Sequence, residues 1–322
     1  MKQHFLPQSY LREFCNAESK LFTLDIDLLK FKRKVFPELK TTAEVCRSKD
    51  FYTIKGDFKT QFQHLNGLDP LFLEKKFQEY EREYPKIIAK IKSRQPDLPL
   101  QEAELFMYAI IDIKIRNPYF RETAVESKKE TVIDTLFDSY RTELAKLELT
   151  DPRQIIRKDV MLEEMDKMKE KIMTDEDFGR KTHLSSLVSR QMETKNVQHK
   201  ISQHLLQFEW RVLYSHNDFF TTDNPGVSID PTNRPQNTKF TDEFFFFMPL
   251  TPHLCLVISS KTPDKAYRVD AANKQIYYAD APKQMIHKIN ELHGFHVTKY
   301  IFSNNQRLID IIAQKINLTA GL

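Results

Sequence analysis

Glycine is scarce in this chain, with only 6 among 322 residues. The phosphate loops of dinucleotide-binding and P-loop proteins need several glycines at fixed spacing, because the backbone must turn tightly and approach the phosphates closely. Neither of these patterns occurs, and the G-x-S-x-G turn of α/β-hydrolases is also absent from the sequence. The sequence therefore argues against three of the commonest enzyme folds, and the fold class must be inferred from the spacing of apolar residues.

The composition is typical of a soluble, intracellular globular protein. Hydrophobic residues make up 40% of the chain and charged residues 29%. The first twenty residues are interspersed with charges, so we expect no secretory signal. Apolar runs are shorter than the roughly 20 residues that a membrane-spanning helix needs. We therefore expect a cytoplasmic protein that does not enter a membrane.

Cysteines and histidines indicate neither a disulfide framework nor a structural metal. Cys15, Cys46 and Cys255 are scattered and lack C-x-x-C spacing. His293 and His296 are interrupted by a glycine and have no obvious third ligand. The net charge of +4 permits nucleic acid or another phosphate-bearing ligand as a partner without pointing to it.

Alternation of apolar and polar residues predicts strands near both ends of the chain. The clearest strand-like segments are 21–26, 31–36, 208–214, 244–248 and 253–259. We expect the first two to pair as a hairpin and the later ones to form a mixed or antiparallel sheet. Helices predicted at 282–293 and 305–316 close the chain.

Residues of about 69–206 have helical periodicity instead. Pro85 is expected to break the first helix, whereas Leu105–Ile115 is apolar on nearly all sides and should form the most buried helix, ending at Pro118. Amphipathic helices follow, and their exposed surface could pair two copies as a homodimer. The chain is therefore predicted to be a single α+β domain over 1–322, with this helical block inserted between strand-rich ends.

The stretch Phe219–Gly226 combines strand and turn signals. Two threonines are followed by Asp223, Asn224, a proline that fixes φ and a glycine that permits unusual φ. This order predicts that a strand ends abruptly and that Asp223 and Asn224 project from its end. Asp223 could orient a catalytic histidine or bind a divalent cation, and it could equally hydrogen-bond its own turn.

The N-terminal segment places His4 and Gln8 four residues apart, on one face of a predicted helix. His4 could serve as a general acid or base, with Gln8 binding substrate. The alternative is a docked N-terminal segment in which His4 is a structural cap.

Arg116 follows the buried helix and precedes Pro118, which pushes the intervening residue out of the helical region. Its guanidinium could clamp a carboxylate or phosphate. A charge partner for the negative end of the helix dipole is an equally good interpretation.

Five short motifs occur in a fixed order. They are His4–Leu11 as H-x-x-P-x-x-Y-L, Arg116–Pro118 as R-x-P, Trp210 with Thr222–Pro225 as W…[ST]-D-N-P, Pro249–Pro252 as P-L-[ST]-P, and Asn290 with Tyr300–Ser303. Together they resemble the uncharacterised bacterial family called domain of unknown function 4238. Gly226 stands where the family usually has an apolar residue, which could loosen the loop behind Asp223. The resemblance implies one common fold over nearly the whole chain and no particular activity.

The polar residues inside these motifs lead to a functional hypothesis. If His4, Arg116 and Asp223 converge on one pocket, Asp223 would stay ionised and raise the pKa of His4, while Arg116 would hold an anion. Gln8 and Asn224 would bind substrate. This set suits a hydrolase acting on a phosphodiester or similar ester, such as a nuclease. The alternative is a non-catalytic binding module whose polar motifs are structural.

Overall fold

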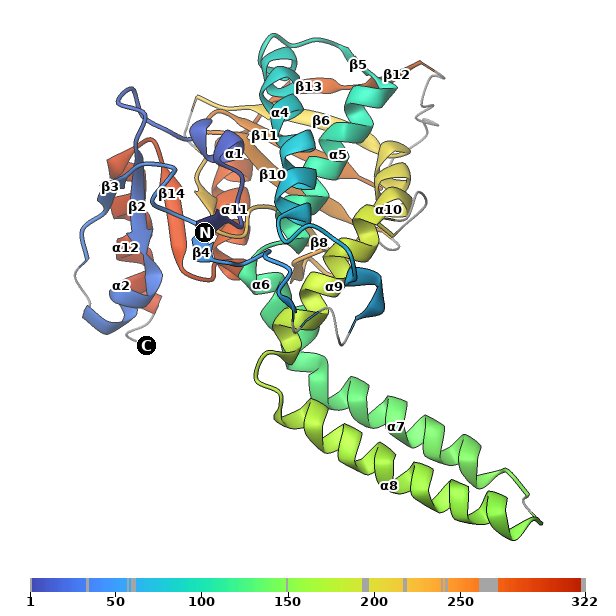
Figure 1. Ribbon diagram of the computed structural model, residues 1–322. Coiled ribbons are helices and arrows are strands. Elements are labelled where there is room, and N and C mark those ends of the chain that lie inside the picture. Colours follow the sequence, from blue (N-terminus) through green and yellow to red (C-terminus); the bar gives the residue numbers. More distant parts are fainter. Residues whose placement is uncertain are drawn as a thin grey trace. The chain divides into compact units, whose positions relative to one another are not determined.

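The computed structural model describes the chain in segments, namely residues 2–32, 35–56, 58, 62–148, 150–192, 197–216, 219–238, 240, 243–260 and 272–319. The chain divides into two compact units (Figure 1). Residues 1–119 and 187–322 together form unit 1, and residues 120–186 form unit 2. The α+β class predicted from the sequence is confirmed, whereas a single domain over 1–322 stays a prediction.

A six-stranded sheet forms the centre of unit 1, in the order β13-β6-β11-β10-β8-β9. Its strands are β6 (Glu209–Tyr214), β8 (Val227–Ile229), β9 (Pro235–Gln236), β10 (Phe245–Thr251), β11 (Leu254–Ser259) and β13 (Tyr277–Asp280). All neighbours are antiparallel except β13 and β6, which are parallel. The predicted mixed sheet is therefore present, with the predicted segment 253–259 as its strand β11.

Both faces of this sheet are covered by helices, which explains the unbroken apolar run at 244–248. On one face, Ile289 of α11 (Lys283–His293) belongs to the same core cluster as Phe247 of β10. On the other face, the Trp210 ring of β6 packs edge-on against Phe106 of α5, with ring centroids 6.0 Å apart. Figure 1 shows α4 and α5 on one side of the sheet and α11 behind it.

Two long helices, α4 (Phe72–Lys92) and α5 (Leu100–Ile115), pack together in unit 1. The predicted break at Pro85 is wrong, because α4 continues through it. Pro85 lies on the exposed face, while Tyr84 and Ile88 beside it are buried. The apolar stripe of α4 therefore holds the helix together across the missing hydrogen bond. The prediction of a buried helix over 105–115 is confirmed, and α5 ends before Pro118.

A second sheet of unit 1 has four antiparallel strands, in the order β3-β2-β14-β7. It consists of β2 (Leu21–Asp25), β3 (Glu38–Lys40), β7 (Thr221–Thr222) and β14 (Tyr300–Ser303). Ile309 of α12 (Gln306–Thr319) and Leu29 of α2 (Ile26–Lys32) share one core cluster with this sheet. The short strand β7 carries the Thr-Thr pair of the central motif into this sheet.

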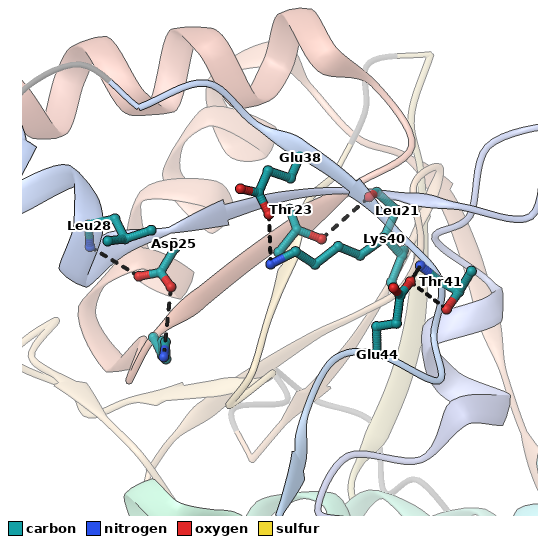
Figure 2. Close-up of polar contacts among 9 residues, drawn as sticks. Leu21, Thr23, Asp25, Leu28, Glu38, Lys40, Thr41 and Glu44 are labelled. Carbon is teal, nitrogen blue, oxygen red and sulfur yellow. Dashed lines mark hydrogen bonds and ion pairs between the residues drawn. The ribbon is translucent and has the colours of Figure 1, made fainter.

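The expected strand at 31–36 is wrong where the structure describes it, because the chain enters α2 directly after β2 and residues 31 and 32 belong to that helix, whereas residues 33 and 34 lie outside the described residues. Figure 2 shows the cause: Asp25 accepts the backbone N–H of Leu28 at 3.1 Å and so caps the start of a helix. The strand that pairs with β2 is β3, further along the chain, where Lys40 forms an ion pair with Glu38 at 2.9 Å. A hairpin-like pair is thus present, with a helix in its connection.

Two small antiparallel ladders attach outlying segments to unit 1. The strand β1 (Lys2–His4) pairs with β4 (Arg47–Lys49), and β5 (Asp97–Pro99) pairs with β12 (Asn273–Gln275). The remaining short elements are α1 (Gln8–Arg12), η1 (Gln63–Leu65), α10 (Val197–Leu206) and η4 (Gly294–His296). The first ladder fixes the N-terminal segment and therefore places His4 at the end of a strand, not on the helical face that we expected.

Unit 2 is a helical hairpin formed by α7 (Lys129–Ala145) and α8 (Pro152–Thr174). Asp151 caps α8 by accepting the backbone N–H of Arg153 at 2.9 Å. Before α7 the chain passes through α6 (Pro118–Phe120) and two short irregular helical turns, η2 (Arg121–Val125) and η3 (Glu126–Lys128). The helix α9 (Phe178–Met192) begins in unit 2 and ends in unit 1. In the parts of the chain that the structure describes, no helix has the length and apolar character needed to span a bilayer.

Candidate functional site

Asn224 is the centre of a buried polar cluster in unit 1. It lies in the turn between β7 and β8 and is 1% exposed. Its Oδ1 accepts hydrogen bonds from Lys114 Nζ at 2.8 Å and Asn117 Nδ2 at 2.9 Å. Its Nδ2 donates to Asn237 Oδ1 at 2.9 Å and to the carbonyl of His296 at 3.0 Å. One side chain therefore connects α5, the residue after β9 and the end of η4 (Gly294–His296).

Lys114 is a buried basic side chain. It projects from α5, is 1% exposed, and donates to Asn224 Oδ1 and to the carbonyl of Gly226 at 2.6 Å. Within the described residues no acidic side chain forms an ion pair with it. Burial alone pushes the pKa of Lys114 well below its usual value, because an ammonium loses solvation inside a protein.

Gly226 makes this arrangement sterically feasible. Its φ of +87° lies in the left-handed region, and a Cβ at this position would come within 2.9 Å of the Phe246 ring and 3.5 Å of Lys114 Cδ. Glycine is therefore required here for both backbone conformation and space. We expected Gly226 to loosen the loop, but its carbonyl instead binds the buried lysine.

Two imidazoles face the same cation. His293 ends α11 and is 1% exposed, and His296 ends the following turn. Burial first, and the nearby Lys114 charge as well, lower the pKa of His296 to about 4. Burial likewise lowers the pKa of His293 to about 4, with Lys114 adding to the effect. Both rings are therefore neutral at physiological pH.

The ring nitrogens of these histidines are only partly satisfied. His293 Nδ1 pairs with the carbonyl of Ile289 at 2.8 Å, and His296 Nδ1 pairs with the Tyr119 hydroxyl at 2.7 Å. The Nε2 atoms of both rings are buried and have no hydrogen-bond partner among the residues that the structure describes. The backbone of Phe247 acts on the pKa of His293, but it does not reach Nε2 with hydrogen-bond geometry. Buried polar atoms without partners are uncommon and often mark functional positions.

The cluster has a buried end and a partly exposed end. Lys114, Asn224 and His293 are enclosed, whereas His296 and Tyr119 are only half-buried. The Tyr119 and His296 rings lie edge to face, with centroids 5.3 Å apart. A ligand approaching from solvent would therefore meet this ring pair before it reached the lysine.

Asp223 points away from this cluster. Its carboxylate accepts the backbone N–H groups of Thr298, Lys299 and Tyr300 at 3.0, 2.6 and 3.1 Å. Burial raises the pKa of Asp223 to about 6, and these backbone hydrogen bonds oppose the rise. The carboxylate thus fixes the chain that leads into β14. A divalent cation at Asp223 would have to displace these donors.

Arg116 is also held by internal contacts. Its Nη2 pairs with Glu81 Oε1 at 2.7 Å, its Nε donates to the carbonyl of Phe5 at 3.3 Å, and its guanidinium lies over the Phe77 ring. A cavity of about 10 Å³ borders Arg116, which is the size of one water molecule. Arg116 therefore joins the N-terminal segment to α4, and this space could not admit a phosphodiester.

His4 and Gln8 lie in the N-terminal segment. His4 Nδ1 pairs with the carbonyl of Val45 at 3.2 Å, and Gln8 Oε1 accepts the Thr42 hydroxyl at 3.3 Å. Burial lowers the pKa of His4, and the charge of Arg116 is among the further causes. The expected rise of the His4 pKa is therefore wrong. His4 and Arg116 are close enough to interact electrostatically. Asp223 is linked to Arg116 only through the hydrogen bond between their sequence neighbours Asn224 and Asn117, so convergence of all three residues on one pocket stays a prediction.

Sequence reasoning missed Lys114 and dismissed His293 and His296. Lys114 lies within a run that we read as an apolar helix, and a lysine there gives no sign of its burial. His293-x-x-His296 was considered only as a metal pair. In the described part of the chain, no three His, Cys, Asp or Glu side chains gather closely enough to hold a metal ion. The one sequence feature that could have identified this site is Lys114 itself, because it is the single basic residue in the most buried helix.

The comparisons with known proteins return one match. A family model described as "Protein of unknown function (DUF4238)" matches residues 2–307. No curated protein and no solved structure matches the chain. The family match spans the whole buried cluster, from Lys114 to His296, and it confirms the resemblance seen in the short motifs.

Proposed function

Because this chain belongs to the DUF4238 family of proteins of unknown function, we propose its function from its own buried cluster: hydrolysis of a phosphodiester or a similar ester. The observation that supports this proposal is the buried amine of Lys114, which lies near two neutral imidazoles and forms no ion pair with a carboxylate of the described residues. A buried cation without a counter-charge favours an anionic ligand, because the anion restores the electrostatic stabilisation that water would give.

The proposed reaction uses residues at both ends of the cluster. A water molecule attacks phosphorus, and His296 Nε2 takes the proton of that water. The ammonium of Lys114 offsets the negative charge that develops on the phosphoryl oxygens and gives its proton to the leaving oxygen as the ester bond breaks. Asn224 and Asn117 position the lysine and the substrate. Separation of the Tyr119 and His296 rings admits the substrate.

This assignment replaces the residues first considered as catalytic. Roles for His4, Arg116 and Asp223 in catalysis, and for Gln8 in substrate binding, stay predictions. Their observed contacts are with backbone groups and internal partners, so our proposal depends on Lys114 and His296 instead. A bacterial, cytoplasmic setting and a nucleic-acid substrate likewise stay predictions.

A turnover assay tests this proposal. The purified full chain is incubated with bis(p-nitrophenyl) phosphate and with labelled single-stranded DNA and RNA. We expect cleavage of at least one phosphodiester, and the variant His296→Gln should be slower by on the order of 100-fold, because a general base is lost. His287→Gln is the matched control, since His287 is an exposed histidine of α11, the helix that precedes the turn of His296. A wild type that cleaves none of these substrates, or a His296→Gln variant with full activity, would refute the proposal.

The second candidate is a binding module without catalysis. The exposed apolar side chains of unit 2 favour it, because such surfaces commonly mark contacts with other chains. A chain with no turnover but with a partner bound through unit 2 would support this alternative.

A further inference from the structure

The helical hairpin of unit 2 buries few of its apolar side chains. Ile133 and Phe137 are the buried residues of α7, and no side chain of α8 is buried. Two-helix hairpins of this kind gain little stability from each other alone, because helices in water depend on a covered apolar face. The exposed surface of the hairpin therefore needs an explanation.

One flank of the hairpin is closed by ion pairs. Arg141 of α7 pairs with Asp166 of α8, and Lys169 Nζ of α8 lies 2.6 Å from Asp134 Oδ1 of α7. Arg141 follows Phe137 by four residues, so the two lie on the same face of α7, about one turn apart. The two ion pairs therefore lie along one side of the interface between α7 and α8.

The opposite flank is apolar. Val132, Leu136 and Tyr140 recur every four residues on α7 and are 56%, 47% and 58% exposed. Met161 and Met168 are seven residues apart on α8 and are 52% and 57% exposed. At about 100° per residue, the stripe of α7 lies across the helix from Asp134 and Arg141, and that of α8 lies across from Asp166 and about a quarter turn from Lys169. Because those residues meet across one flank, the two stripes come together on the other. We call these five residues the apolar face.

We infer that the apolar face of unit 2 packs against the same face of a second copy of this chain, so that two hairpins form a four-helix bundle. A two-fold axis allows one patch to cover itself, and the resulting dimer is closed. Bundles built from antiparallel hairpins are a common form of helix packing. The sequence predicted a homodimer through the helical block, and this inference assigns the contact to the apolar face.

The size of the face suits a dimer. Five half-exposed side chains of this kind offer about 500 Å² per copy, and a symmetric pair would bury about 1,000 Å². That area is near the lower limit for a specific interface. Neighbouring methylene groups of charged side chains would add to it.

The charges of the hairpin permit self-association. The α7 segment carries four acidic and two basic side chains. The α8 segment carries five acidic and six basic ones. The two hairpins are therefore nearly neutral, and α7 of one copy would meet α8 of the other without net repulsion. A strongly charged partner would gain nothing from this surface.

The molar mass of the full chain in solution tests this inference. We expect light scattering coupled to size exclusion to give about twice the 38.2 kDa of one copy at protein concentrations on the order of 10 µM. The variant Leu136→Glu should shift the mass to that of a monomer, because a charge would be buried at the centre of the face. Circular dichroism checks that its helix content is unchanged.

Val160→Glu supplies the matched control. Val160 is 53% exposed, but at 100° per residue it lies about a quarter turn from Met161 and Met168, outside the apolar face. This variant should remain a dimer. A monomeric wild type would overturn the inference and leave the face to a different protein. Equal loss of dimer in Leu136→Glu and Val160→Glu would overturn it as well.

Discussion

Tyr10 illustrates what single residues of the family motifs do in this structure. Its buried hydroxyl donates to the carbonyl of Pro249 at 2.9 Å and pairs with Thr221 Oγ1 at 2.6 Å. The first motif, the residue that precedes Thr222–Pro225, and the Pro249–Pro252 motif thus meet at one phenol. Asp223 and Arg116 have the same character, since each bonds to the backbone of a distant segment. The motif residues therefore hold the fold together, and chemistry is assigned to their neighbours.

Gly226 provides the sharpest prediction at this scale. Replacement by alanine should lower the free energy of unfolding by about 1–3 kcal/mol, because φ is +87° and the added Cβ would meet the Phe246 ring at 2.9 Å. Chemical denaturation measures this change. Gly294→Ala is the control, since Gly294 has φ of −67° and open space around it. Equal stability of Gly226→Ala and wild type would show that the turn can relax.

At the scale of elements, α4 shows how packing can override a local preference. Pro85 removes a backbone hydrogen bond in the middle of a helix, and yet the helix continues. We therefore predict that Pro85→Ala raises the free energy of unfolding by about 1–3 kcal/mol, because the lost hydrogen bond returns and no packed side chain is removed. Lys86→Ala, at an exposed neighbour, should change it little. A lower stability of Pro85→Ala would mean that α5 packs only against the proline-containing form of α4.

The type of each element could be predicted where the apolar pattern is strong. The prediction failed where a single side chain determines whether a helix or a strand forms. The sheet strands and α5 follow directly from their periodicity. Asp25 turned a predicted strand pair into a strand and helix, because its carboxylate caps the next turn. Pro85 was given too much weight, because the burial of its neighbours cannot be seen from local sequence.

At the scale of the whole molecule, the candidate site depends on contacts across more than one hundred residues. Lys114 and Asn224 are 110 positions apart. The sequence identified Asn224 but gave no means to find its partner. Burial also could not be predicted for Lys114, since an exposed lysine would fit the same helix. A sequence pattern can therefore identify polar residues in apolar segments, whereas the folded chain determines which of them meet.

The last prediction concerns the stability of the whole molecule as a function of pH. His293 has an ordinary pKa near 6.5, and burial lowers it to about 4 in the folded protein. Between these two values the unfolded chain binds a proton that the folded chain does not, so this histidine makes the free energy of unfolding fall as the pH decreases from about 6.5 to about 4. Burial raises the pKa of Asp223 to about 6, which acts in the opposite direction. The effect of His293 must therefore be measured as a difference.

That difference is obtained from urea unfolding of wild type and His293→Gln at several pH values from about 7.5 to about 4. This range includes both the unfolded and the folded pKa of His293. At neutral pH the variant should be the less stable protein, because a buried and packed ring is replaced. As the pH falls, its stability relative to wild type should improve by up to about 3 kcal/mol, since the variant has no imidazole to keep neutral. The exposed His287→Gln variant should follow the wild-type course. A difference between wild type and His293→Gln that stays constant with pH would mean that His293 is solvated or protonated in the folded chain, and the neutral imidazole beside Lys114 would have to be abandoned.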